Sequence, residues 1–172
     1  VGDYEPRYNV APGQNSLVVT SDGDGPRLRN MRWGLAPHWS RDAGMGARLI
    51  NARGETAHEK PAFRESMRQR RCLVLASGFY EWQKPGRAPW FLRPAGRELF
   101  TFAGLWELWQ GGEEPLYTFT ILTTAPNDFM SRIHDRMPVI LPREVESEWL
   151  LHGPRELLVP YAQPMEGWPV SR

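Results

Sequence analysis

Two stretches of the sequence place a polar residue among apolar or aromatic neighbours, where its side chain could take part in catalysis. Asn51 follows the apolar pair Leu49-Ile50, and a carboxamide buried there must find hydrogen-bond partners or cost about 1–3 kcal/mol. Glu81 stands in the segment Gly78-Phe79-Tyr80-Glu81-Trp82. Aromatic neighbours keep water away from a carboxyl group, which suits it to proton transfer near neutral pH.

A third candidate, His134, lies in the polar cluster Ile133–Pro138, which precedes an apolar run. Imidazole can move protons at pH 7, the neighbouring Asp135 can orient it, and Arg136 can hold a phosphate.

Each of the three candidates also has an ordinary structural interpretation. Asn51 can end a strand by bonding to its own backbone, Glu81 can face solvent on an edge strand, and His134 can lie in a surface turn.

Several other kinds of site lack their motifs. No GxxxxGK[ST] segment occurs, the glycine pairs at 23/25 and 44/46 lack a third glycine, and the four histidines have no HExxH spacing. We therefore expect no metal and no cofactor. Cys72 is the only cysteine and enters an apolar strand, so we expect an inert core thiol although Arg71 precedes it.

Composition places the chain among globular proteins and leaves room for a nucleic-acid partner. The chain has 172 residues, of which 41% are hydrophobic and 24% charged, and no apolar run is long enough to cross a bilayer. Residues 1–100 carry 16 basic and 10 acidic residues, whereas residues 101–172 carry 5 and 10. Arginine and tryptophan suit phosphate binding and base stacking, although arginine-rich codon usage and an aromatic core explain the same composition.

The elements that must position these residues are short strands and a few helices. The fold class expected is α+β, a single domain over residues 1–172 with a mostly antiparallel, curled or barrel-like β-sheet and a few flanking helices. Strands are expected at 8–10, 17–19, 28–33, 72–76, 79–82, 89–92, 99–103, 105–109, 117–121 and 139–141. Helices are expected at 61–70, 127–133 and 143–151. The tail from Pro160 to Arg172 is expected to be packed coil with Trp168 covered.

Six segments in this order resemble the signature blocks of the SRAP (SOS-response-associated peptidase) family of abasic-site processing proteins. They are Arg7–Gly13, Trp33–Trp39, Asn51–Glu55, Gly78–Trp82, Thr123–Ala125 and His134–Pro138, and together they extend over nearly all of the chain.

The resemblance implies a sensor of abasic sites that binds single-stranded DNA and forms a covalent cross-link with it. In the family, an amino-terminal Cys is exposed by self-removal of the initiator Met. Its amine forms an imine with the ring-opened sugar, and its thiol closes a thiazolidine. Carried over to this sequence, Asn51 would position the amine, Glu81 would shuttle protons, and His134 would assist sugar ring opening and imine chemistry.

The resemblance also implies how DNA is held. Arg53 and Arg136 would bind flanking phosphates, and Trp33 with nearby loop residues would stack on or wedge against bases. Asn9 and Trp39 complete the expected DNA-binding set. We further expect a monomer that acts in the cytoplasm, at the nucleoid if the source is bacterial, without contact to a membrane.

The chain departs from the family pattern at both ends, which look shortened. It begins with Val1-Gly2 instead of a cysteine, so we expect that the chain as it stands does not form the cross-link. Cys72 cannot replace the missing residue, because a thiazolidine needs its amine and thiol on one residue. Two other functions stay open, a non-covalent single-stranded nucleic-acid binder with a vestigial site and a peptidase that acts on other proteins.

Overall fold

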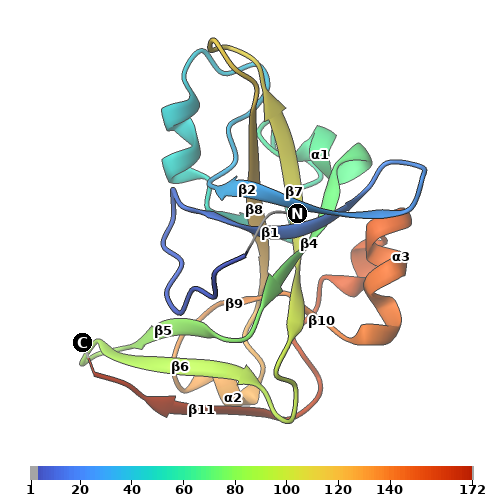
Figure 1. The fold of residues 1–172 in the computed structure, drawn as a ribbon. Helices are drawn as coiled ribbons and strands as arrows, with labels where there is room; N and C mark the ends of the chain where they lie inside the picture. The colour runs from blue at the N-terminus through green and yellow to red at the C-terminus, as the bar shows by residue number, and fades with distance from the viewer. Residues whose placement is uncertain (1–3, 172) are drawn as a thin grey trace.

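A closed barrel of five strands forms the centre of the computed structural model, which describes residues 4–171 (Figure 1). Around the barrel run β7 (Phe100–Trp109), β4 (Arg71–Ala76), β1 (Asn15–Ser21), β2 (Pro26–Trp33) and β8 (Leu116–Thr124), and β8 pairs again with β7. The β2–β8 contact is parallel and the other four are antiparallel.

Three short strands extend this sheet and gather distant segments around one end of β8. β3 (Asn51–Arg53) runs parallel to β8, β9 (Met137–Pro138) pairs with its other edge, and β10 (Ile140–Leu141) pairs with β7. Thr123 is opposite Arg53 on one side and Pro138 on the other. The segments around Asn51 and His134 therefore approach the same end of this strand.

A second sheet lies below the barrel in Figure 1 and contains β5 (Phe79–Gln83), β6 (Ala88–Pro94) and β11 (Met165–Pro169). The short helix α2 (Asp128–Ser131) lies close to this sheet. Asn127 caps the helix, because its side-chain oxygen accepts a hydrogen bond from the Met130 amide at 2.8 Å.

Two more α-helices lie against the outside of the barrel, α1 (Arg64–Gln69) and α3 (Glu146–Leu151). The 3-10 turns η1 (Ala43–Arg48), η2 (Arg143–Val145) and η3 (Arg155–Leu157) complete the helical elements of residues 4–171. Arg71 ties both helices to β4, because its guanidinium donates to carbonyl oxygens of Met67 and Arg68 near the end of α1 and to those of Trp149 and Leu151 in α3. Within the described residues, no helix is long and apolar enough to cross a membrane.

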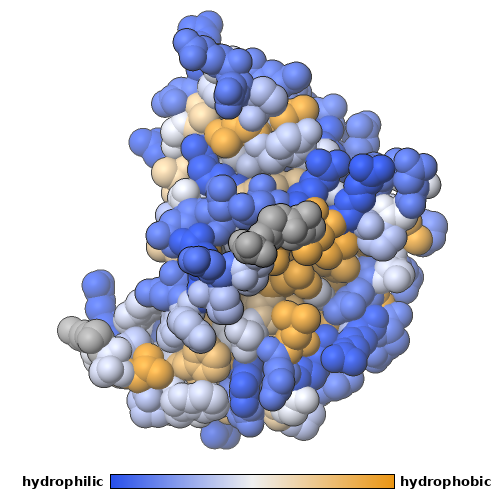
Figure 2. All heavy atoms as spheres, in the orientation of Figure 1, coloured by the Kyte–Doolittle hydropathy of each residue, from blue (hydrophilic) through white to orange (hydrophobic). Residues whose placement is uncertain are grey.

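The barrel strands bury apolar side chains on both faces. On β4, Cys72 and Val74 belong to one core cluster, whereas Leu73 packs into a second cluster that also contains Trp149 of α3. This two-sided burial accounts for the uninterrupted apolar sequence of the strand. The face seen in Figure 2 is mostly hydrophilic, with a hydrophobic patch near its middle, over β4.

The structure confirms the α+β class and the mostly antiparallel, barrel-like sheet, and it corrects four details. Residues 8–10 form no strand. The strands expected at 99–103 and 105–109 form the single strand β7. Gly104 lies within this strand because the neighbouring strand packs closely against it, and not because the chain turns there. A Cβ at this position would lie 2.8 Å from Val74 and 2.9 Å from Cys72.

The tail was also expected to be coil, and it contains β11 instead. This strand supplies hydrogen bonds to an edge of β6 that would otherwise lack partners. Trp168 was expected to be covered but is 44% exposed, with its ring against Phe91 and beneath the Arg93 guanidinium.

Candidate active site

An open cleft of about 510 Å³ lies beside β5 and is lined by Glu81 and His134 together with Trp82, Lys84 and Arg87. A neighbouring hollow of about 390 Å³ shares Lys84 and His134 with the cleft and reaches the Ser131–Asp135 segment after α2. Because the two spaces share two lining residues, we treat them together as the candidate site.

Strand alternation directs Glu81 towards His134. Residues 79 and 81 of β5 share a face, and Phe79 packs on the core while Glu81 is paired with Trp90 of β6. The Glu81 Oε1 atom lies 3.8 Å from His134 Nε2 and accepts a hydrogen bond from the Trp82 amide at 3.2 Å. Both side chains are about one quarter exposed, at 24% and 25%. Acid and imidazole therefore face each other with solvent access, and they are close enough for one ligand hydroxyl or water to reach both from the side of the pair.

The backbone around His134 sets the orientation of its ring. Two acceptors face His134 Nδ1, the Arg136 carbonyl at 3.1 Å and Asp135 Oδ1 at 3.2 Å, and the Arg136 amide lies at 3.1 Å from the same nitrogen. The two acceptors favour the tautomer with its proton on Nδ1, which leaves Nε2, the nitrogen that faces Glu81, able to accept a proton from a ligand. A proton can thus pass between the two groups through a shared ligand.

Gln83 holds the two sides of the site together. Its Nε2 donates to the carbonyl oxygen of Arg132 at 3.1 Å, and its Oε1 accepts from the Trp90 indole at 3.3 Å. Gln83 lies two residues after Glu81 and Arg132 two before His134, so this bond fixes the spacing of the acid and the imidazole.

Arg136 is already engaged by a carboxylate. Its two terminal nitrogens donate to the Glu55 oxygens at 2.7 and 2.8 Å, and one of them also reaches Thr123 Oγ1 at 3.0 Å. This bidentate bond, with a smaller contribution from Arg53, lowers the pKa of Glu55 from 4.5 to about 2. A phosphate that approaches Arg136 must therefore share this guanidinium with Glu55 or displace it.

Asn51 does not lie where a buried carboxamide would. It is exposed on β3, opposite Ile121 of β8. Among residues 4–171, no hydrogen bond joins its side chain to Glu81 or His134. The structure therefore pairs two of the three predicted catalytic residues and leaves the third without a direct bond to them. The interpretation of Asn51 as a buried group in need of partners was wrong, because β3 is a short outer strand.

Comparison with known proteins places the whole of this sequence in one family. The family model described as "SOS response associated peptidase (SRAP)" matches residues 1–172. The chain belongs to the SRAP family. It is 47% identical to the abasic site processing protein YoaM of Bacillus subtilis, over 99% of this chain and 80% of that protein. It is 36% identical to the abasic site processing protein HMCES of Xenopus tropicalis, over 87% of this chain and 55% of that protein.

Two solved structures share the fold of this chain. A crystal structure of a protein from Bacteroides thetaiotaomicron superposes with a TM-score of 0.85 at 30% identity, over 92% of this chain and 75% of that one. A second crystal structure, from Bordetella bronchiseptica, also has a TM-score of 0.85 and covers 99% of this chain and 90% of that one. At 24% identity the second shows a shared fold alone.

The aromatic and amide residues expected to bind DNA in this SRAP chain have different surroundings. Trp33 is half-buried, stacks on Phe119 and donates from its indole to the Ile50 carbonyl at 2.9 Å, so it supports the strand that carries Asn51. Trp39 is 51% exposed. Asn9 is exposed in a segment that passes β5, where the Tyr80 hydroxyl donates to the Tyr8 carbonyl at 3.0 Å. Arg53 is also exposed.

Sequence reasoning gave no role to three cleft residues, Trp82, Lys84 and Arg87. Trp82 is 51% exposed at the cleft, and Lys84 lines both hollows from the turn that joins β5 to β6. A basic turn directly after the strand of Glu81 was the signal that could have identified the lysine. The expectations about the amino terminus concern residues 1–3, which lie outside the described residues.

Proposed function

We propose that this SRAP protein processes abasic sites in single-stranded DNA by forming a covalent bond to the ring-opened sugar. The observation that carries the proposal is the Glu81–His134 pair, which lies in an open cleft at a separation of 3.8 Å. The names of its relatives YoaM and HMCES support the choice of substrate.

The proposed reaction needs a proton acceptor and a proton donor at one carbon atom. His134 takes the proton of the sugar C1′ hydroxyl as the C1′–O4′ bond breaks, and it returns this proton to O4′, which leaves an aldehyde at C1′ and a hydroxyl at C4′. Glu81 removes a proton from the attacking ammonium group and returns it to the carbinolamine hydroxyl, which leaves as water to give the imine. Asn51 contributes by positioning the amine.

The thiol that closes the ring comes from the same amino-terminal residue as the amine. In the full-length protein we assign this role to a Cys exposed after self-removal of the initiator Met. Thiolate addition to the imine carbon then gives the thiazolidine, with water as the only leaving group. Cys72 cannot act here, because it is fully buried and burial raises the pKa of its thiol.

DNA binding in this proposal uses both positive charge and stacking. Arg53 and Arg136 hold phosphates, and exposed indoles such as Trp82 stack on bases next to the lesion. The second hollow, with Lys84 and the Ser131–Asp135 segment, accommodates the next part of the strand.

The test uses full-length protein and a single-stranded oligonucleotide that contains one abasic site. The proposal expects an adduct that survives denaturation, disappears when the amino-terminal Cys is changed to Ala, and forms slowly with Glu81→Gln or His134→Gln. Glu113→Gln is the matched control, since Glu113 is exposed in the β7–β8 turn away from the cleft.

Salt-sensitive binding without any adduct would favour the non-covalent binder instead. Cleavage of other proteins that needs Glu81 and His134 would favour the peptidase. Either result contradicts the covalent proposal.

A further inference from the structure

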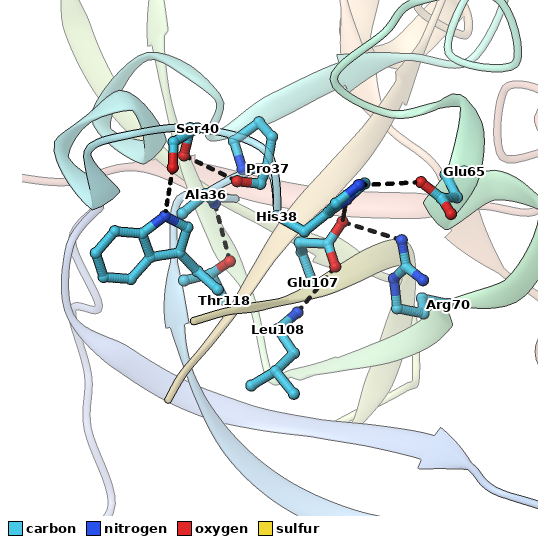
Figure 3. A network of polar contacts seen from close by, with 10 residues as sticks. Ala36, Pro37, His38, Ser40, Glu65, Arg70, Glu107, Leu108 and Thr118 are labelled. Atoms are coloured by element: carbon cyan, nitrogen blue, oxygen red, sulfur yellow. Dashed lines mark hydrogen bonds and ion pairs between the residues drawn. The ribbon is translucent and has the colours of Figure 1, made fainter. Parts of the chain in front are cut away.

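The loop between β2 and η1 is fastened to the barrel at Ala36 and at Ser40 (Figure 3). The Ala36 amide donates to Thr118 Oγ1 at 2.9 Å, and the Trp109 indole donates to the Ser40 carbonyl at 2.9 Å. The Ser40 amide and hydroxyl both donate to the Pro37 carbonyl, at 2.9 and 2.8 Å. With so many internal bonds, this loop has little freedom to change shape.

The His38 side chain adds a further anchor to the loop. Its Nδ1 lies 3.1 Å from Glu107 Oε2, and its Nε2 lies 3.4 Å from Glu65 Oε2 on α1 (Figure 3). The Glu107 side chain is only 5% exposed, and its oxygens also accept from Arg70 at 3.0 Å and from the Leu108 amide at 3.0 Å. A carboxylate this deeply buried is stable only with such partners, so it has few other positions to adopt.

Trp39, between these fastened residues, points a large apolar side chain towards water. It is 51% exposed, whereas Pro37 and Ser40 are buried. An indole is usually covered, and a rigid one that stays in solvent loses little conformational entropy when it binds a partner. Arg41, two positions further along the chain, is also exposed and can supply positive charge next to the indole.

We propose that His38, Glu107 and Arg70 form a clamp that holds Trp39 ready to stack on an unpaired base of single-stranded DNA. The clamp residues are positioning residues, because none of them is required to touch the DNA. The choice of DNA as ligand rests on the proposed function, whereas the clamp itself rests on the contacts above.

A double-mutant cycle tests whether His38 acts through Trp39. Binding of a fluorescent single-stranded oligonucleotide without an abasic site is measured by anisotropy, which separates stacking from cross-linking. Trp39→Ala and His38→Ala are each expected to weaken binding about 10-fold, and the double variant no more than either. Losses that multiply would overturn the proposal, because His38 would then act independently of Trp39.

Glu107→Gln and Glu65→Gln form a matched pair on the two sides of His38. Glu107→Gln should weaken binding about as much as His38→Ala. Glu65→Gln should change it less than twofold, because that carboxylate is 48% exposed and accepts only from the far nitrogen. Equal effects of the two substitutions would overturn the assignment of Glu107 as the anchor.

A spectroscopic measurement keeps the clamp testable if the proposed function fails. In 5-fluorotryptophan protein, the fluorine resonance of Trp39 is identified by its absence in Trp39→Phe. His38→Ala should move or broaden that resonance and leave the resonance of buried Trp149 unchanged. If the wild type binds no single-stranded DNA, the proposed function fails, and this spectrum alone decides the clamp. An unchanged Trp39 resonance would overturn the clamp.

Discussion

Two glutamate–histidine pairs in this protein are built in opposite ways. Glu81 and His134 lie 3.8 Å apart in an open cleft, each about one quarter exposed. Glu107 and His38 lie 3.1 Å apart, and the Glu107 side chain is nearly buried and also bonded to Arg70 and a backbone amide. A solvent-accessible carboxylate with few protein partners can accept a proton from a ligand. A buried carboxylate whose two oxygens both accept hydrogen bonds from the protein keeps neighbouring segments in place instead. The geometry of the Glu81–His134 pair therefore suits proton transfer, whereas that of the Glu107–His38 pair suits positioning of the loop.

Removing the buried carboxylate should have the largest effect on stability. Glu107→Ala leaves Arg70 and His38 without their shared partner, and we expect the free energy of unfolding to fall by about 3 kcal/mol. Glu81→Ala should change it by about 0.5 kcal/mol or less, since that side chain has solvent access. Urea denaturation followed by circular dichroism measures both, and similar losses for the two variants would contradict the contrast between the pairs.

For the cross-linking rate, the order of the two pairs should be the opposite, with the larger effect at Glu81. Glu81→Gln keeps the size of the side chain and removes its proton-accepting charge, so we expect the cross-linking rate of the full-length protein to fall about 100-fold. Glu65→Gln, which changes a comparable exposed carboxylate beside the other histidine, should leave the rate within twofold. Single-turnover gel assays give both rates, and a Glu81→Gln variant as fast as the wild type would exclude this residue from proton transfer.

The Glu55–Arg136 ion pair combines solvent exposure with two short hydrogen bonds, and it gives a prediction about pH dependence. Folding lowers the pKa of Glu55 from 4.5 to about 2, so the bond stabilises the protein fully above pH 4.5 and is lost as the pH falls towards 2. Because the Glu55 side chain is 50% exposed, solvent screening limits its contribution to about 1 kcal/mol. Wild type and Glu55→Gln should thus differ in stability at pH 6 and agree near pH 2. A difference that persists at pH 2 would have another origin.

The smallest expected effect concerns the two lysines of the chain, which provide a matched pair. Lys84 lines the cleft, whereas Lys60 is exposed before α1. Lys84→Gln should weaken binding of single-stranded DNA about threefold and reduce the slope of log K against log salt by about 0.7, and Lys60→Gln should do neither. Equal slopes for both variants would place the DNA elsewhere.

The predicted residues that the structure brings together are those whose neighbours along the chain are informative. Glu81 stands between aromatic residues and His134 in a short polar cluster, and strand alternation together with a local turn was enough to direct the two towards one cleft. Roles for these residues stay predictions. Arg136 was expected to be available for phosphate, and its partner Glu55 could not be foreseen because the two are 81 residues apart.

Contacts that depend on closure of the barrel could not be predicted. His38 and Glu107 are 69 positions apart and meet only because β7 and β8 pair beside the end of β2. Gly104 was interpreted as a break between strands because a glycine required by close packing has the same sequence signature as one required by a turn. The exposure of Trp168 likewise depends on β11 lying at the edge of its sheet.

Cys72 has a practical consequence for future work on the chain. Its side chain is fully buried in one of the two core clusters, so thiol reagents cannot reach it in the folded state. A cysteine introduced on the surface can therefore be labelled selectively without removing the natural one. Modification of Cys72 itself requires the strands around it to separate, and its rate of alkylation under native conditions measures how often they do.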